Sequence, residues 1–374
     1  MLSPNTPLVS VDDHVIEPPN TWVDRAPAKF KDRVPKVVET DGGREAWSYE
    51  GTLVPVSRSV VKLLDGVVVP EEGAVRFDEM RPGCYDPKAR LTDMDLDGVW
   101  AEVGFPNYAR FAGHRFFPKN DPELSLHCLE SYNDFILDEW CAAAPDRYIP
   151  LAIVPWWDID QAIKETERVV AKGAKSIAFS ENPTVLGLPS IHTDHWDPFL
   201  DLVNHHGLPM SLHFGSSSKV HTSSDDAPVS VAYTLAGVGS MTAAADWLLS
   251  GLFDRYPNIR LALSEGGAGW APFILERADK FYRDRPEVVT KVKTKPSEAF
   301  KEHIYLCLVT DAFALLHLDE IGDANVMFEA DFPHSDSEYP NSRTVFDEAT
   351  KHLSAESTEL VAHLNARRLY NFHS

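Results

Sequence analysis

The stretch "SVDDHVIEPP", residues 10–19, places two aspartates, a histidine and a glutamate within six positions. Apolar, β-favouring residues at positions 8–11 precede the acids, so we expect these groups at the end of a buried strand. In a strand, Asp12 and His14 share one face, whereas Asp13 points to the other face and is expected to be structural. Carboxylate and imidazole groups that share a face can bind a divalent metal ion.

Acids or histidines also follow four other predicted strands. The residues at these strand ends are Ser180-Glu181-Asn182, His213-Phe214-Gly215, Ser264-Glu265-Gly266 and Glu329-Ala330-Asp331, with His334 three residues further on. Each alone has an ordinary structural explanation, because aspartates often cap turns and histidines often make structural hydrogen bonds. Five strand ends that aim such groups at one point would be unfavourable without a counter-charge. A bound divalent cation is therefore favoured over a purely structural network.

The elements that must position these residues are predicted strands that alternate with predicted helices. The apolar runs lie at 8–11, 99–105, 148–154, 176–179, 210–212, 260–263, 304–309 and 326–328. Between them, residues 159–172 have helical spacing and end at Gly173, and residues 196–206 form a second such stretch that ends at Gly207.

Eight short strands that alternate with helices predict an α/β fold, a parallel (β/α)8 TIM barrel formed as a single domain by residues 1–374. An open, doubly wound sheet is the alternative, and the absence of a GxGxxG motif after a strand disfavours it. In a barrel, active sites lie at the carboxyl ends of the strands, where the acids and histidines are predicted.

Two segments interrupt the alternation of strands and helices. Residues 30–90 are expected to be an insertion after the first strand, with a hairpin around Asp41-Gly42-Gly43. Residues 214–240 are rich in Gly, Ser, Thr and Asp and are expected to form a long loop, either a lid or a surface connection.

The composition restricts the partners of the 374-residue chain. Its formal net charge of -22 argues against nucleic acid and anionic membranes, so we expect a small-molecule substrate. The four cysteines have no CxxC spacing, and neither a signal peptide nor a membrane span is evident. We therefore expect a cytoplasmic protein, for which the sequence allows a homodimer.

The motifs "DDHVIEPP", "LHFGSSS", "LSEGGAGWAPFILERAD" and "FEADFPHSD" occur in this order over nearly the whole chain. With them the sequence resembles the amidohydrolase superfamily, in the amidohydrolase-related branch that includes aminocarboxymuconate semialdehyde decarboxylase and γ-resorcylate decarboxylase. The resemblance implies a barrel with a metal site at its mouth, and it is less specific for the reaction.

The resemblance also implies roles for single residues. The HxH motif of the family falls on Asp12 and His14, so its first histidine is a carboxylate here. The histidine ligand of the fifth strand falls on His213, and the aspartate of the eighth strand, a ligand or general base in the family, falls on Asp331. The sequence departs from the family at the sixth strand, where Glu265 replaces a histidine.

A second departure lies at the fourth strand, where Glu181 stands at the position of the carboxylated lysine of dinuclear hydrolases. The full predicted ligand set is Asp12, His14, Glu17, Glu181, His213, Glu265 and Asp331. So many carboxylates favour a dinuclear site with two iron ions, with zinc or manganese as alternatives. The predicted catalytic residues are Glu265, Asp331 and His334; for His334, orienting Asp331 is favoured over binding metal or acting as an acid on the substrate.

Three functions are compatible with this site. The favoured one is an O2-dependent di-iron monooxygenase that hydroxylates a hydrophobic small molecule such as an acyl-CoA or terpenoid acid, because the acid-rich site resembles a di-iron branch of the superfamily. The alternative is a metal-dependent hydrolase or non-oxidative decarboxylase. A catalytically inactive barrel that only binds a ligand is least favoured, because the residues at the strand ends are intact.

Overall fold

The computed structural model describes residues 6–56, 61–64 and 73–373. Its central strands correspond to the eight apolar runs predicted from the sequence, which confirms the expected barrel. They are β1 (Val9–Val15), β5 (Ala101–Pro106), β6 (Tyr148–Ile149), β7 (Leu151–Ala152), β8 (Ser176–Ser180), β9 (Met210–His213), β10 (Leu261–Ser264), β11 (Ile304–Leu308) and β12 (Val326–Phe328).

These strands are parallel and are hydrogen-bonded in the orders β1-β5-β6 and β7-β8-β9-β10-β11-β12. β6 and β7 are the two halves of one predicted strand, divided at Pro150, which has no N–H to donate. The barrel closes between its first and last strands, where the Asp331 amide donates to the carbonyl of Asp12 over 2.8 Å. The sequence-distant acids at the two strand ends thereby become neighbours.

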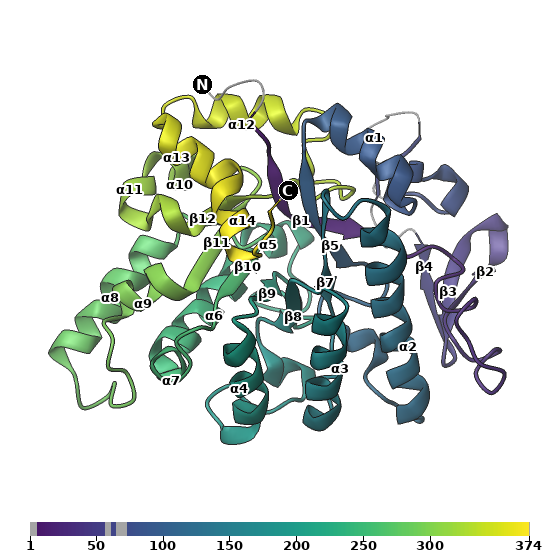
Figure 1. Ribbon diagram of the computed structural model, residues 1–374, viewed down its shortest axis with the longest axis horizontal. Helices are drawn as coiled ribbons and strands as arrows, with labels where there is room; N and C mark the ends of the chain where they lie inside the picture. Colours follow the sequence, from purple (N-terminus) through teal and green to yellow (C-terminus); the bar gives the residue numbers. More distant parts are fainter. Residues whose placement is uncertain (1–5, 57–60, 65–72, 374) are drawn as a thin grey trace.

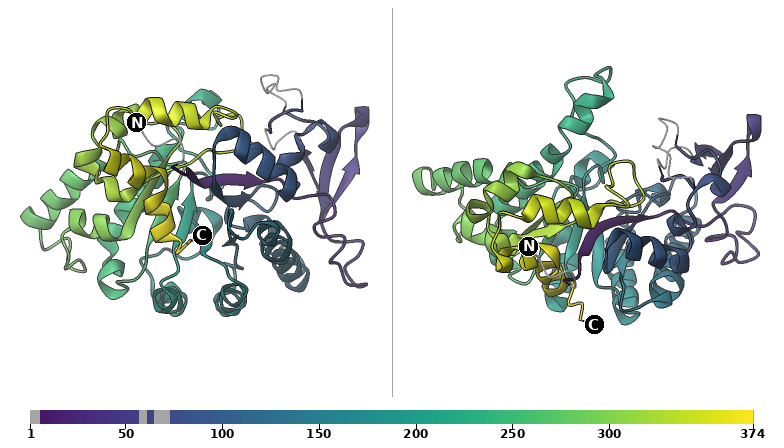
Figure 2. Two further views of the ribbon diagram at one scale, coloured as in Figure 1. Left: turned by 45° about the horizontal axis from the view of Figure 1, so that its top comes forward. Right: turned by 90° about the horizontal axis from the view of Figure 1, so that it is seen from above.

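Helices surround the strands on the outside (Figures 1 and 2). They are α1 (Pro87–Asp97), α2 (Pro122–Phe135), α3 (Ile159–Ala171), α4 (Asp197–His206), α5 (Val229–Thr234), α6 (Gly237–Ser250), α7 (Leu252–Arg255), α8 (Ala271–Asp284), α9 (Pro296–His303), α10 (Ala312–Leu316), α11 (Leu318–Ile321), α12 (Ser342–Thr350), α13 (Ala355–Glu359) and α14 (Asn365–Leu369). The two helices predicted from periodicity are α3 and α4, and left-handed Gly207 ends α4 as expected.

The insertion after β1 contains a small antiparallel sheet of β2 (Lys36–Glu39), β3 (Glu45–Tyr49) and β4 (Thr52–Pro55), which lies beside the barrel in Figure 1. The pairing of β2 with β3 confirms the hairpin predicted around Asp41. Within the insertion predicted at 30–90, residues 57–60 and 65–72 lie outside the described part of the chain.

The segment 214–240 is more ordered than a Gly/Ser-rich loop would suggest. It contains α5 and the start of α6, and Figure 2 shows α5 projecting away from the barrel. Val229 and Tyr233 of α5 are 69% and 62% exposed, so this helix is not held by a buried apolar face. None of the helices in the described ranges has the length and apolar character needed to cross a membrane.

Candidate metal centre

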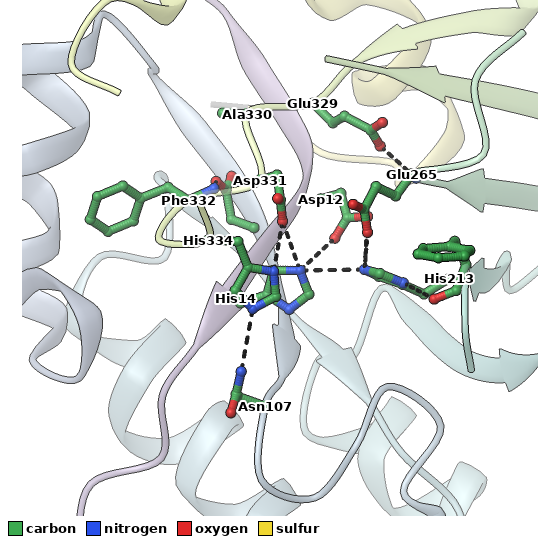
Figure 3. A network of polar contacts seen from close by, with 12 residues as sticks. Asp12, His14, Asn107, His213, Glu265, Glu329, Ala330, Asp331, Phe332 and His334 are labelled. Atoms are coloured by element: carbon green, nitrogen blue, oxygen red, sulfur yellow. Dashed lines mark hydrogen bonds and ion pairs between the residues drawn. The ribbon is translucent and has the colours of Figure 1, made fainter. Parts of the chain in front are cut away.

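The strand ends bring Asp12, His14, His213 and Asp331 together inside the barrel (Figure 3). Asp12 and His14 lie two residues apart on β1 and both face inward, as strand alternation requires. His213 is the last residue of β9, and Asp331 lies in the turn after β12. All four side chains are buried, with at most 1% exposed.

The donor atoms of the four residues converge around Nε2 of His14. This atom lies 3.0 Å from Asp331 Oδ1, 3.3 Å from His213 Nε2 and 3.6 Å from Asp12 Oδ1. Asp12 Oδ2 lies 3.3 Å from His213 Nε2. Within the described chain, no donor other than the facing imidazoles reaches the carboxylate oxygens of Asp12 or Asp331.

Burial lowers the pKa values of the two imidazoles and raises that of Asp12. Burial lowers the pKa of His14 to about 4, and it lowers the pKa of His213 well below its ordinary value. Burial, followed by the charges of Glu329, Asp331 and Glu265, raises the pKa of Asp12 well above its ordinary value. The neutral imidazoles have the form that binds metals, and a bound cation would offset the burial and the like charges that otherwise favour the protonated form of Asp12.

Two overlapping groups of donors lie close enough to hold a metal ion, Asp12–His14–His213 and His14–Asp331–His334, and they share His14. Ligands that surround a tetrahedral ion at bond lengths near 2.1 Å are separated from one another by about 3.4 Å. Three separations from Nε2 of His14 and the separation between Asp12 and His213 run from 3.0 to 3.6 Å. Two neutral imidazole nitrogens so close together, with unpaired carboxylate oxygens beside them, form a site for a divalent cation.

Glu265 lies at the edge of the cluster. Its Oε2 is 3.5 Å from Nε2 of His213, and its side chain is 23% exposed, more than the four buried donors. The backbone of Glu265 is left-handed, with φ 54°, immediately after β10. This strained turn directs the side chain toward the cluster instead of continuing the strand.

Glu329 belongs to the site, although the sequence analysis did not include it among the functional residues. It is buried, and its Oε2 accepts the backbone N–H of Glu265 over 3.0 Å. Burial raises the pKa of Glu329 to about 8. The sequence feature that could have identified Glu329 is the spacing in "EAD", because Glu329 and Asp331 lie two residues apart after β12.

Glu17 and Glu181 are not brought to the cluster, and this corrects their predicted role as ligands. The carboxylate of Glu17 accepts the backbone N–H groups of Tyr108 and Ala109, at 2.7 and 3.0 Å. Oε1 of Glu181 accepts from the Gly215 amide at 2.9 Å and from the Ser217 hydroxyl at 3.0 Å. Both glutamates therefore anchor loops beside the site.

Glu181 fits closely against helix α6. A Cβ atom built at Gly239 would lie 2.1 Å from Oε2 of Glu181, so a larger residue would require the carboxylate to move. Oε2 itself has no hydrogen-bond partner within the described chain, and burial raises the pKa of Glu181 to about 7.

His334 contacts two members of the cluster. Its Nδ1 lies 3.1 Å from Asp331 Oδ1, and its ring stacks on His14 with the ring centroids 3.8 Å apart. Nε2 of His334 lies 3.3 Å from the side-chain nitrogen of Asn107. This geometry allows His334 to orient Asp331, the role favoured by the sequence, and also places it within reach of a metal bound by His14 and Asp331.

Comparison with known proteins matches residues 22–372 to the family model Amidohydro_2, described as amidohydrolase. The 2-amino-3-carboxymuconate-6-semialdehyde decarboxylase of Dictyostelium discoideum is 24% identical over 264 residues, 69% of this chain and 69% of that protein. The γ-resorcylate decarboxylase of Rhodococcus jostii is 28% identical over 228 residues, 56% of this chain and 68% of that protein.

A solved structure shares the fold. The 5-carboxyvanillate decarboxylase of Novosphingobium aromaticivorans, complexed with manganese and a nitrobenzoic acid, has a TM-score of 0.66 at 15% identity, over 99% of this chain and 97% of that one. The matched relatives are named as decarboxylases. The prediction of a di-iron monooxygenase is therefore wrong, and the alternative of a non-oxidative decarboxylase is the better supported one.

Proposed function

This chain belongs to the amidohydrolase family, and from this premise we propose its reaction. We propose that it catalyses the metal-dependent, non-oxidative decarboxylation of a small planar carboxylic acid. The observation that carries the proposal is the cluster of donors around His14 with the largely buried carboxyl group of Glu265 at its edge, 3.5 Å from His213. The relatives support it, since they are named as decarboxylases of an unsaturated semialdehyde acid and of an aromatic acid.

In this proposal, Asp12, His14, His213 and Asp331 would hold one divalent ion, because the donor atoms of the other three lie within 3.6 Å of Nε2 of His14. When bound, the ion supplies Lewis acidity that polarises the oxygen atoms of the substrate. The sequence favoured two iron ions. We propose a single ion because, of the seven predicted ligands, Glu17 and Glu181 are engaged elsewhere and Glu265 lies at the edge of the cluster, which leaves four donors around His14. Manganese is the ion to test first, because it is bound in the related carboxyvanillate decarboxylase.

Glu265 would supply the proton that the reaction requires. Loss of CO2 breaks a carbon–carbon bond and leaves the electron pair on the substrate carbon. A proton from the carboxyl group of Glu265 then forms the new C–H bond, and solvent returns the proton to Glu265. Burial, followed by the charges of Asp331 and Glu329, raises the pKa of Glu265 well above its ordinary value, which favours the protonated form. Where the family resemblance implies an acid–base histidine, this chain thus uses a glutamate.

We propose a planar substrate because an aromatic side chain lies beside the metal donors. Phe111 stacks on His213 with ring centroids 3.8 Å apart and an angle of 20° between the rings, and it forms a flat apolar surface beside the donors. We further propose that the described parts of the segment 30–90 and the start of the segment 214–240, before the projecting helix α5, cover the site and exclude water. A hydrogen bond of 2.5 Å between Ser218 Oγ and His114 Nε2 supports the role of the start of 214–240, because it fastens the loop after β9 to the loop after β5. A cytoplasmic location and a homodimer remain predictions.

The test is an incubation of the Mn²⁺-loaded protein with 2,6-dihydroxybenzoate and, separately, with 5-carboxyvanillate. Chromatography would measure the decarboxylated product, and a coupled assay would measure CO2, while an oxygen electrode follows O2. We expect product and CO2 in equal amounts with no O2 consumed. Hydrolysis of an amide or ester panel by the same preparation, with no CO2 from either acid, would overturn the proposal in favour of a hydrolase.

A further inference from the structure

A buried ionic network lies behind the metal cluster, on the outward face of β1. It consists of Asp13 on β1, Arg90 on α1 and Glu102 on β5, which are 1%, 1% and 2% exposed. Nη1 of Arg90 donates to both carboxylate oxygens of Glu102, at 2.8 and 2.9 Å. Such a network is costly to bury, and apolar residues of similar volume would serve a core at least as well. Stability alone therefore does not explain why this network is buried here.

The other donors of Arg90 reach the backbone that carries the metal ligands. Nη2 donates to the carbonyl oxygen of His14 over 2.5 Å, and Nε donates to the carbonyl oxygen of Gly83 over 2.6 Å. The guanidinium group also lies over the ring of Phe332, 4.5 Å from its centroid. Phe332 directly follows Asp331, so one side chain contacts the segments of two ligands.

Asp13 connects the same two segments. Its Oδ1 accepts the backbone N–H of Phe332 over 2.8 Å. Beside this bond, the amide of His14 donates to the carbonyl of Phe332 over 2.7 Å. Asp331 has a left-handed backbone with φ 54°, a conformation that a non-glycine residue keeps only when its surroundings hold it.

We propose that Arg90 is a positioning residue for the metal centre and that, with Asp13 and Glu102, it sets the placement of His14 relative to Asp331. His14 and Asp331 come from opposite ends of the chain, and their donor atoms lie 3.0 Å apart. The guanidinium group of Arg90 holds the β1 backbone through the carbonyl of His14. Asp13 holds the turn that bears Asp331 through the amide of Phe332. The inference rests on the proposed metal site but is independent of the reaction catalysed there.

The test compares Arg90→Lys with the wild type in metal-free form. Lysine keeps the charge but cannot contact Glu102, Gly83 and His14 simultaneously. Electron paramagnetic resonance titration would give the Mn²⁺ affinity, and the visible spectrum of the Co²⁺-loaded protein would report the ligand geometry. We expect the affinity to fall 10- to 100-fold and the Co²⁺ bands to shift, because groups that orient metal ligands have effects of this size.

Arg168→Lys is the control. Arg168 on α3 makes a similar two-pronged pair with Glu165, at 2.7 and 2.8 Å, and α3 supplies no residue of the cluster. This variant should lower the melting temperature and leave the Mn²⁺ affinity and the Co²⁺ spectrum unchanged. An unchanged affinity and spectrum in Arg90→Lys, or equal losses in both variants, would overturn the proposal.

A second pair of variants covers the case in which Arg90→Lys does not fold. Asp13→Asn keeps an oxygen that can accept from the Phe332 amide, whereas Asp13→Ala removes it. We expect Mn²⁺ affinity to be weakened strongly by alanine and largely restored by asparagine; equal affinities in the two would contradict the proposal. These measurements need no substrate, so a protein that binds Mn²⁺ but releases no CO2 would refute the proposed reaction and leave this inference intact.

Discussion

Nε2 of His14 and Nε2 of His213 lie 3.3 Å apart in the interior of the barrel, although 198 residues separate the two histidines in the chain. Burial keeps both rings neutral, since it lowers the pKa of each below its ordinary value. Two neutral rings at this distance form at most one poor hydrogen bond, and the neighbouring carboxylates of Asp12 and Asp331 receive no donor besides these rings and His334 within the described chain. A shared cation satisfies all of these groups at once.

Metal content tests this arrangement directly. After dialysis against Mn²⁺ and removal of free metal, we expect about one ion per chain in the wild type, since one set of donors has separations suited to one ion. His213→Ala should lose the ion and remain folded by circular dichroism. Glu265→Gln should keep it. Two ions in the wild type and one in Glu265→Gln would instead support the dinuclear site predicted from the sequence.

Glu265→Gln should separate metal binding from proton transfer. The amide preserves the size of the side chain but carries no acidic proton, so we expect kcat for CO2 release to fall by about 10²- to 10⁴-fold. The Mn²⁺ content should stay unchanged. The exposed Glu276→Gln on α8 is the control and should leave kcat unchanged. Full activity in Glu265→Gln would exclude this residue as the proton donor.

Glu181→Gln should change the pH dependence of stability. The pKa of Glu181 is raised to about 7 in the folded protein, against an ordinary value of 4.5, so the folded state binds more protons between these two pH values. The contribution of Glu181 to stability is therefore greatest below pH 4.5 and is lost as the pH rises through 7. The difference between the two pKa values corresponds to on the order of 3 kcal/mol in the free energy of unfolding.

Glutamine stays neutral at every pH and can still accept from Gly215 and Ser217. The free energy of unfolding of Glu181→Gln, relative to the wild type, should thus increase from pH 4.5 to 7 and then level off. Urea titrations at several pH values would measure it, with Glu276→Gln as the control. A difference that does not vary with pH would contradict the prediction.

Gly239→Ala should destabilise the protein, although alanine favours helices. The added Cβ would lie 2.1 Å from Oε2 of Glu181, which forces the carboxylate away from Gly215 and Ser217. We expect a loss of about 1–3 kcal/mol in the free energy of unfolding. In the Glu181→Ala background the same change should cost little or be favourable, because the obstructing oxygen is gone. Additive effects in a double-mutant cycle would show that the two residues do not interact.

The sequence by itself determined the barrel. The eight apolar runs became its strands, because burial inside a closed parallel sheet selects short, β-favouring segments whatever their partners are. The sequence also determined that Asp12 and His14 share a face, since side-chain direction along a strand alternates residue by residue. His213 and Asp331 were found through their family motifs and their places at strand ends, and in the structure donor atoms of Asp12, His213 and Asp331 all lie within 3.6 Å of Nε2 of His14.

Only the tertiary structure decided which strand-end acids reach the cluster. Glu17 and Glu181 have the same chemistry as Glu265, yet their carboxylates bind the backbone amides of Tyr108 and Gly215. Beyond a strand end, the direction of a side chain depends on the local turn and on the groups the fold presents to it. Left-handed φ angles at Glu265 and Asp331 turn these two acids inward, and nothing in the residue types at these positions reveals such angles. The contact of Arg90 with His14 likewise joins distant segments and exists only once the barrel has closed.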